Sequence, residues 1–155
     1  RYLDVETVDF SVNELGKPYH KEIAGKQTVN FNISHSGEFI LEGFAVGMDI
    51  GVDVQEMAGC PDYREIAGNF YTAEEAEDVI NEGPELFFQY WAAKEAYVKA
   101  IGIGLGRGMD FFSVRNGEIT EKGRKGQGWH LYPVKIEGYA AYVAAHKKGD
   151  KSNEL

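Results

Sequence analysis

The sequence PELFFQYWAAKEAYVKAIG, at residues 84–102, decides the fold that this chain is expected to adopt. Proline is favoured at the first position of a helix, and glycine is favoured just after its last turn. Between them, large apolar residues recur at helical spacing from Phe87 to Val98. The pattern predicts one long helix at about residues 85–101, with an apolar side that must pack against the rest of the domain.

Runs of β-branched and aromatic residues surround this helix in the sequence and predict strands. The first two runs are joined by Ser36-Gly37-Glu38, which is typical of a hairpin turn. In the third run Asp53 and Gln55 share one face of the strand, because alternate residues of a strand point the same way. The expected strands are residues 29–33, 39–46, 50–55, 111–115, 129–136 and 139–146.

Two shorter helices are predicted between the third strand and the long helix. Pro61 suits the first position of a helix, and Thr72-Ala73-Glu74-Glu75 has the capping-box pattern for a helix that runs to about Asn81. Residues 121–128 are rich in Gly, Lys and Arg and predict a loop. We therefore expect an α+β domain in which an antiparallel sheet packs on one long helix.

Length and charge exclude several classes of protein. The chain has 155 residues, which at about 150 residues per domain is one domain. Its net charge of −9 opposes the phosphate binding on which nucleic-acid proteins depend, and no apolar run is long enough to span a membrane. Cys60 is the single cysteine, which excludes an internal disulfide and favours a reducing compartment. We expect a cytoplasmic protein with neither a nucleic-acid nor a membrane partner.

Two acidic residues stand among apolar neighbours. Asp53 lies on a predicted strand, Glu95 lies in the middle of the apolar helix, and Lys99 follows one turn later. If the helix packs on the sheet, the two carboxylates could meet and offer the oxygen ligands that Mg²⁺ prefers, with Lys99 facing phosphate groups. The alternative is an ordinary surface ion pair between Glu95 and Lys99 with Asp53 in a turn, and composition alone favours this alternative.

Ser34-His35-Ser36 invites comparison with a hydrolase, but neighbouring residues of a strand point to opposite faces. Ser34 and His35 therefore cannot readily form a nucleophile and base. The three residues either complete a structural turn or bind a phosphate by hydrogen bonds. Cys60 has no nearby histidine and is expected to be an ordinary thiol rather than a nucleophile.

Five short motifs follow one another along the chain: Gly16-Lys17-Pro18, FNISHSG at 31–37, GVDV at 51–54, Phe70-Tyr71 and WAAKEAYVK at 91–99. Read in this order, they resemble the 4'-phosphopantetheinyl transferases of the Sfp type. The resemblance covers roughly residues 15–114. The short trimeric holo-acyl-carrier-protein synthases share some of these elements, but they have no Ser-His-Ser ahead of the aspartate.

The resemblance implies a fold of two similar halves that pack against each other. Residues 1–155 would form a single transferase domain, with about 1–58 as the remainder of the first half and about 59–155 as the second half. The chain opens without Met, and Gly-Lys-Pro begins at residue 16, whereas the family normally has a further segment before it. The first half is therefore expected to be incomplete.

The resemblance also implies transfer of 4'-phosphopantetheine from coenzyme A to a serine of an acyl or peptidyl carrier protein, with release of 3',5'-ADP. Asp53 and Glu95 match the family's Mg²⁺ ligands, and Glu95 or a metal-bound water is the candidate base. Lys94 and Lys99 match lysines that contact the pyrophosphate and handle protons. Asp53, Glu95 and Lys99 are thus the expected catalytic residues.

By the same matching, Lys17 and Pro18 would lie near the adenine of coenzyme A, and Ser34 and His35 near its 3'-phosphate. The family commonly has a second carboxylate where this chain has Gln55, so this metal ligand would offer an oxygen without a charge. Two alternatives remain open. One is a module that binds coenzyme A or a carrier protein but has impaired catalysis, and the other is a Mg²⁺-dependent phosphohydrolase that needs no carrier.

Overall fold

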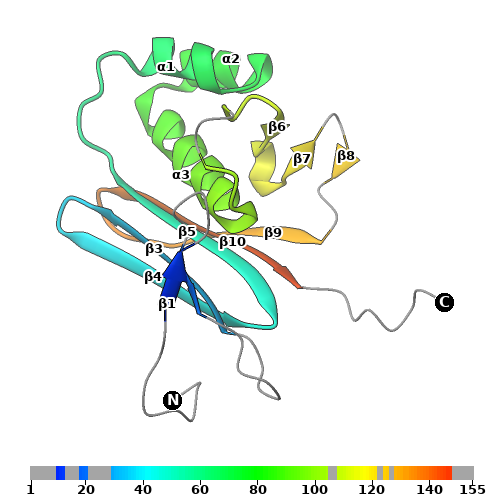
Figure 1. The fold of residues 1–155 in the computed structure, drawn as a ribbon. Helices are drawn as coiled ribbons and strands as arrows, with labels where there is room; N and C mark the ends of the chain where they lie inside the picture. The colour runs from blue at the N-terminus through cyan, green and yellow to red at the C-terminus, as the bar shows by residue number, and fades with distance from the viewer. Residues whose placement is uncertain are drawn as a thin grey trace.

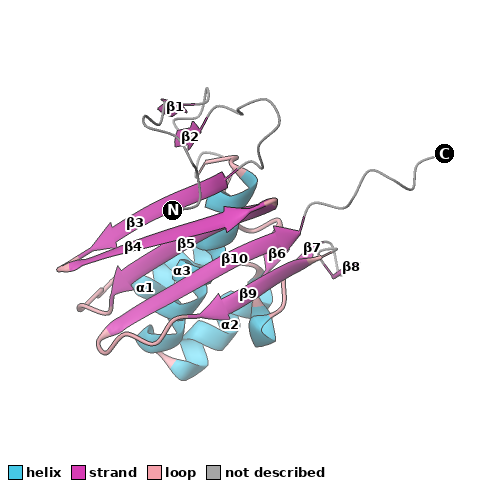
Figure 2. Cartoon of the chain, turned by 90° about the horizontal axis from the view of Figure 1, so that it is seen from below, coloured by secondary structure: helices cyan, strands magenta, loops and turns pink. Residues whose placement is uncertain are grey.

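In the computed structural model of the chain, the α-helices lie on one side of the layer that the long strands form (Figure 1). Figure 2, viewed from below, shows the long strands in front and the helices behind them. Within the residues described, no helix combines the length and the hydrophobicity that a membrane crossing requires. The model describes residues 10–12, 18–20, 29–104, 108–121, 124–125 and 128–147.

The α+β class expected from the sequence is confirmed. The helices are α1 (Tyr63–Phe70), α2 (Ala73–Glu82) and α3 (Pro84–Ile101), with a 3₁₀ turn at Arg115–Gly117. The strands are β1 (Phe10–Val12), β2 (Pro18–His20), β3 (Val29–Ser36), β4 (Phe39–Val46), β5 (Met48–Glu56), β6 (Phe112–Ser113), β7 (Thr120–Glu121), β8 (Arg124–Lys125), β9 (Trp129–Pro133) and β10 (Tyr139–Lys147).

Strand β5 is the centre of the strand layer. It pairs antiparallel with β10 from Met48 to Glu56, and β10 pairs antiparallel with β9 on its other edge. Val52 and Val54 of β5 are fully buried. The predicted hairpin is also confirmed, because β3 and β4 pair antiparallel around Gly37, which has the positive φ of 52° that the turn requires.

The hairpin contacts β5 through side chains instead of a backbone ladder. Polar side chains of β3 accept hydrogen bonds from backbone N–H groups of β5, and each donor lies 20 residues beyond its acceptor. Because donors and acceptors advance together, β3 and β5 run in the same direction. The pairs are Asn32 with Val52 (2.8 Å), Ser34 with Val54 (3.3 Å) and Ser36 with Glu56 (2.9 Å).

Helix α3 lies directly against the backbone of β5. A β-carbon added at Gly51 would overlap the backbone of Ala96 and Ala100. Both alanines are buried, so small residues on the helix and a glycine on the strand together permit this close approach. The capped ends of α3 agree with the sequence prediction, with Pro84 in its first turn and Gly102 in the left-handed conformation after its last.

Local details of the prediction need correction. Helix α1 begins at Tyr63 and not at Pro61, because Asp62 takes the N-cap position. The predicted strand at 111–115 shortens to β6, since positive φ angles at Asn116 and Gly117 turn the chain. The strand predicted at 129–136 ends at Pro133.

The predicted loop at 121–128 is wrong in part, because β8 lies within it and pairs with β7. The capping box predicted for α2 is present in full. Thr72 accepts a hydrogen bond from the Glu75 backbone, and the Glu75 carboxylate accepts one from the backbone of Thr72.

Replacing Gly51 by Ala should destabilise the fold, because the new methyl group must push α3 away from β5. Overpacking of this kind costs about 1–3 kcal/mol. Gly68→Ala is the matched control, since a β-carbon there meets no atom within 4 Å and the residue lies in α1. The control should gain about 0.5–1 kcal/mol from its higher helix propensity. Urea unfolding of both variants checks this, and equal stabilities would contradict the contact.

Candidate active site

Asp53 is the centre of a polar cluster where β3, β5 and α3 meet. Its side chain is 1% exposed. Asp53 Oδ1 accepts hydrogen bonds from Ser34 Oγ at 2.7 Å and from Lys99 Nζ at 2.6 Å, and Oδ2 accepts one from Gln55 Nε2 at 2.9 Å. Glu95 completes the group through its electrostatic interaction with Asp53 and Lys99. We refer to Ser34, Asp53, Gln55, Glu95 and Lys99 as the Asp53 cluster.

Glu95 is a member of the Asp53 cluster whose acidity is altered by its surroundings. Burial is the largest cause that raises the pKa of its carboxyl group, the negative charge of Asp53 adds to it, and Lys99 opposes both effects, so that the resulting pKa is about 7. A buried carboxyl group next to a second carboxylate prefers its neutral form. Glu95 can therefore exchange a proton close to neutral pH, as a general base must.

The positions of these residues follow from local geometry. Residues four apart on a helix share a face, so Glu95 and Lys99 approach β5 together. The expected approach of Lys99 to Asp53 is present as an ion pair of 2.6 Å. Glu95 interacts electrostatically with both groups, and its direct meeting with Asp53 stays a prediction. The surface ion pair considered as an alternative does not describe the structure, because Glu95 is only 6% exposed and Lys99 pairs with Asp53. The Lys99 side chain remains 28% exposed, so the cluster is open on the lysine side.

The donors of the cluster fit a magnesium ion. Mg²⁺ is usually held by one or two carboxylates, with water and substrate phosphates completing its shell. Asp53 and Glu95 supply two carboxylates whose mutual repulsion a cation would relieve. No larger group of His, Cys, Asp or Glu ligands occurs in the part of the chain that the structure describes.

Gln55 takes part in the cluster as a hydrogen-bond donor. Its amide nitrogen faces Asp53 Oδ2, so its amide oxygen points elsewhere. Gln55 and Cys60 also line a small, mainly apolar cavity of about 230 Å³ together with Phe88 and Trp91. The role of Gln55 as a metal ligand stays a prediction.

Lys94 lies away from the Asp53 cluster, and its expected contact with pyrophosphate must be corrected. Its ammonium group is 0% exposed and forms an ion pair with Glu75 Oε2 at 2.7 Å. It also donates hydrogen bonds to the carbonyl groups of Met109 (2.8 Å) and Phe112 (2.6 Å). Consecutive residues on a helix project about 100° apart, so Lys94 enters the core while Glu95 faces the sheet. Lys94 is a structural cation.

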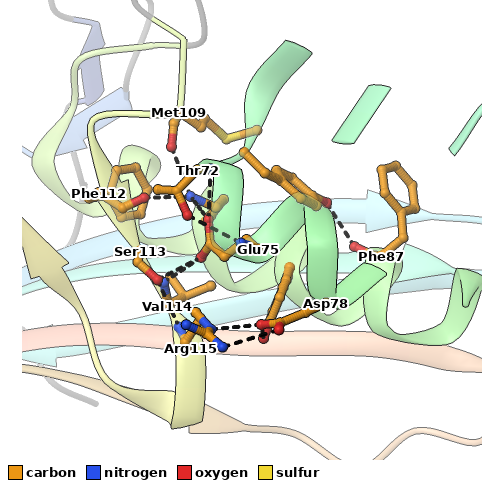
Figure 3. A network of polar contacts seen from close by, with 12 residues as sticks. Thr72, Glu75, Asp78, Phe87, Met109, Phe112, Ser113, Val114 and Arg115 are labelled. Carbon is orange, nitrogen blue, oxygen red and sulfur yellow. Dashed lines mark hydrogen bonds and ion pairs between the residues drawn. The ribbon is translucent and has the colours of Figure 1, made fainter. Parts of the chain in front are cut away.

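Glu75 is the residue that the sequence prediction missed at this position. Its Oε1 accepts hydrogen bonds from the Val114 backbone at 2.7 Å and from Ser113 Oγ at 3.1 Å. Figure 3 shows these residues and Thr72 converging on the Glu75 carboxylate. The sequence marked Glu75 as the glutamate of the capping box. That motif accounts for only one contact of its carboxylate, the hydrogen bond from the Thr72 backbone N–H. Glu75 therefore links α2 to the segment after α3.

The remaining predicted residues differ in position. Ser34 is buried and bonded within the Asp53 cluster, whereas His35 is exposed, as strand alternation requires. Lys17 lies outside the described residues, and Pro18 opens β2 with its side chain outside the description. The structure thus groups Ser34 with Asp53 and separates it from His35.

The chain belongs to the 4'-phosphopantetheinyl transferase superfamily, whose family model matches residues 49–145. It is 36% identical over 117 residues to a 4'-phosphopantetheinyl transferase of Bacillus subtilis, covering 73% of this chain and 50% of that protein. The identity is 34%, with the same coverage, to the 4'-phosphopantetheinyl transferase Sfp of Bacillus subtilis strain 168. The chain spans about half the length of the curated relatives that it matches.

A mammalian relative and a solved structure are also similar. The rat L-aminoadipate-semialdehyde dehydrogenase-phosphopantetheinyl transferase is 26% identical over 161 residues, covering 85% of this chain and 52% of the relative. The crystal structure of Thermotoga maritima holo-[acyl-carrier-protein] synthase aligns with a TM-score of 0.48 at 20% identity, covering 67% of this chain and 70% of that one. Asp53 and Glu95 both lie within the segment that the family model matches.

The raised pKa of Glu95 makes stability depend on pH. The folded chain holds this proton up to about pH 7, whereas the ordinary pKa is 4.5, so Glu95 costs stability increasingly as pH rises between these values. Glu95→Gln should therefore gain little over the native chain at pH 4 and gain roughly 3–4 kcal/mol above pH 7, at about 1.4 kcal/mol per pKa unit.

Urea unfolding in a chelating buffer from pH 4 to pH 8 measures this difference. Glu85→Gln, an exposed position on the same helix, is the control and should show no growing gain. A constant difference between the native chain and Glu95→Gln across this range would contradict the buried, proton-holding state of Glu95.

Proposed function

We propose that this chain transfers 4'-phosphopantetheine from coenzyme A to a serine hydroxyl of an acyl or peptidyl carrier protein and releases 3',5'-ADP, with Mg²⁺ as its metal. The observation that carries the proposal is the buried pair of Asp53 and Glu95, with Lys99 beside it, inside the segment that matches the superfamily. Two carboxylates can hold a divalent cation, and that cation, together with the adjacent lysine, would suit the negative charge of a pyrophosphate substrate.

The reaction would form a bond between the serine oxygen and the β-phosphorus of coenzyme A. The bond from this phosphorus to the bridging oxygen would break, and 3',5'-ADP would leave with that oxygen. The serine must lose its proton, and the Glu95 carboxylate or a water bound to the metal would accept it. The Lys99 ammonium group, partly exposed, is suited to attract the phosphate oxygens.

Asp53 and Glu95 are the residues that would hold Mg²⁺. When bound, the ion would neutralise the charge that builds on the phosphate groups during transfer. Asp53 needs a fixed orientation for this role, and Ser34, Lys99 and Gln55 all bond to it.

Gln55 supports a second candidate function. It stands where the family commonly has a carboxylate and donates to Asp53 through its amide nitrogen, so the site has one negative charge fewer. A module that binds coenzyme A or a carrier without efficient transfer would have these features. Incubating apo acyl carrier protein or an apo peptidyl carrier domain with coenzyme A and Mg²⁺ separates the candidates, because only transfer adds the mass of a phosphopantetheine arm to the carrier.

Glu95→Gln and Asp53→Ala should each lower the transfer rate by about 10²–10³, because lost electrostatic contacts in active sites have effects of this size. Mass spectrometry of the carrier over time gives the rate. Glu85→Gln is the control on the same helix and should transfer normally. Near-native transfer by a folded Glu95→Gln variant would remove Glu95 from the mechanism, and mass gain at equal rates in all variants would remove the whole site.

Gln55→Glu should tighten Mg²⁺ binding, because ligand charge is a main control of divalent-ion affinity. The change also replaces the donor to Asp53 Oδ2 by a third carboxylate, which a cation would compensate. Calorimetric titration with Mg²⁺, in the presence of coenzyme A, measures the affinity. Unchanged or weaker binding would show that position 55 does not face the ion.

A further inference from the structure

The hydroxyl group of Ser34 makes more hydrogen bonds than any role in a turn requires. Ser34 Oγ donates to Asp53 Oδ1 at 2.7 Å and accepts from Lys99 Nζ at 3.0 Å and from the Val54 backbone N–H at 3.3 Å. The residue is 6% exposed, so water does not compete freely for these bonds. Ser34 thus connects the strand β3 to both charged groups that face it.

The three bonds fix the direction of the Ser34 proton. A serine hydroxyl has one proton to donate and two lone pairs to accept with. Lys99 and the Val54 N–H act here as donors, so they occupy both lone pairs. The single proton must then point at Asp53, which agrees with the 2.7 Å distance.

The same accounting applies to the carboxylate of Asp53. Each carboxylate oxygen accepts about two hydrogen bonds. Oδ1 already accepts from Ser34 and Lys99, whereas Oδ2 accepts only from Gln55 among the described contacts. Oδ2 is therefore the oxygen that can still accept a further hydrogen bond or bind a cation.

We propose that Ser34 is a positioning residue that holds Asp53 Oδ1 against Lys99 and so reserves Oδ2 for a divalent cation. In this proposal Ser34 acts on the cation through Asp53. The inference rests on the proposed function for the identity of the cation and of the reaction. The hydrogen bonds on which it is built belong to the chain itself.

Ser36 provides a matched control on the same strand. It lies on the same face of β3, two residues from Ser34, and its Oγ accepts the backbone N–H of Glu56 at 2.9 Å. Ser36→Ala removes one bond between β3 and β5. Ser34→Ala removes the corresponding bond to Val54 and, in addition, the bonds to Asp53 and Lys99. The difference between the two variants isolates the contact with the Asp53 cluster.

The experiment compares the native chain with Ser34→Ala, Ser34→Thr and Ser36→Ala. Calorimetry with Mg²⁺ in the presence of coenzyme A gives the metal affinity, and carrier mass against time gives kcat and KM. Groups that orient metal ligands typically affect metal affinity or activity by about 10–100-fold. We expect Ser34→Ala to lose about tenfold or more in Mg²⁺ affinity and in kcat, at an unchanged KM for the carrier. Ser34→Thr, which retains a hydroxyl, should recover most of both, and Ser36→Ala should match the native chain.

Equal Mg²⁺ affinity and kcat in Ser34→Ala and Ser36→Ala would overturn the proposal. If Ser34→Ala fails to fold in urea titrations, Ser34→Thr and Ser34→Cys decide, since the thiol is a weak donor. The positioning role is supported if Ser34→Thr binds Mg²⁺ with the native affinity and Ser34→Cys binds it weakly. Equal Mg²⁺ affinities of these two variants would overturn it. A native chain that binds Mg²⁺ but modifies no carrier would contradict the proposed function alone.

Discussion

The approach of α3 to the backbone of β5 is the constraint on which the site depends. Gly51 allows it from the strand side, and Ala96 and Ala100 allow it from the helix side. If α3 lay at the usual distance of a helix from a sheet, a gap would separate the Asp53 side chain from Glu95 and Lys99. With the backbones in contact, the short Asp53 side chain reaches Lys99 and interacts with Glu95. The packing of small residues thus brings these three charged groups close enough to interact.

Helix α3 carries two ionic systems with different environments. On one side Lys94 and Glu75 are fully enclosed, and burial lowers the pKa of Lys94 while Glu75 opposes this effect. Charges buried in this way are costly unless every polar atom has a partner, which the carbonyl groups of Met109 and Phe112 help to ensure. On the other side Lys99 remains partly exposed. Of these two ion pairs, only the one between Lys99 and Asp53 is accessible to a substrate.

Local sequence signals predicted the helices and the hairpin well, because caps, turns and periodicity act over a few residues. The capping box at Thr72 and the ends of α3 are examples. The roles of Lys94 and Ser34 could not be predicted in this way. Lys94 is 19 residues in sequence from Glu75, and Ser34 is 65 from Lys99, so tertiary packing alone decides their partners. The short pairing of β7 with β8 was missed because its four residues are all polar and glycines lie close to them in the sequence.

The side-chain contact between β3 and β5 has a consequence for the order of folding. Its partners lie only 20 residues apart, so the hairpin and β5 can associate as soon as residue 56 has left the ribosome. The other edge of β5 waits for β10, which begins at Tyr139. During that interval one edge of β5 has no sheet partner. The hairpin can already cover the face that carries Val52, and α3 then covers the opposite face, which carries Gly51. Folding during synthesis should therefore pass through an intermediate with α3 docked and one edge of β5 unpaired.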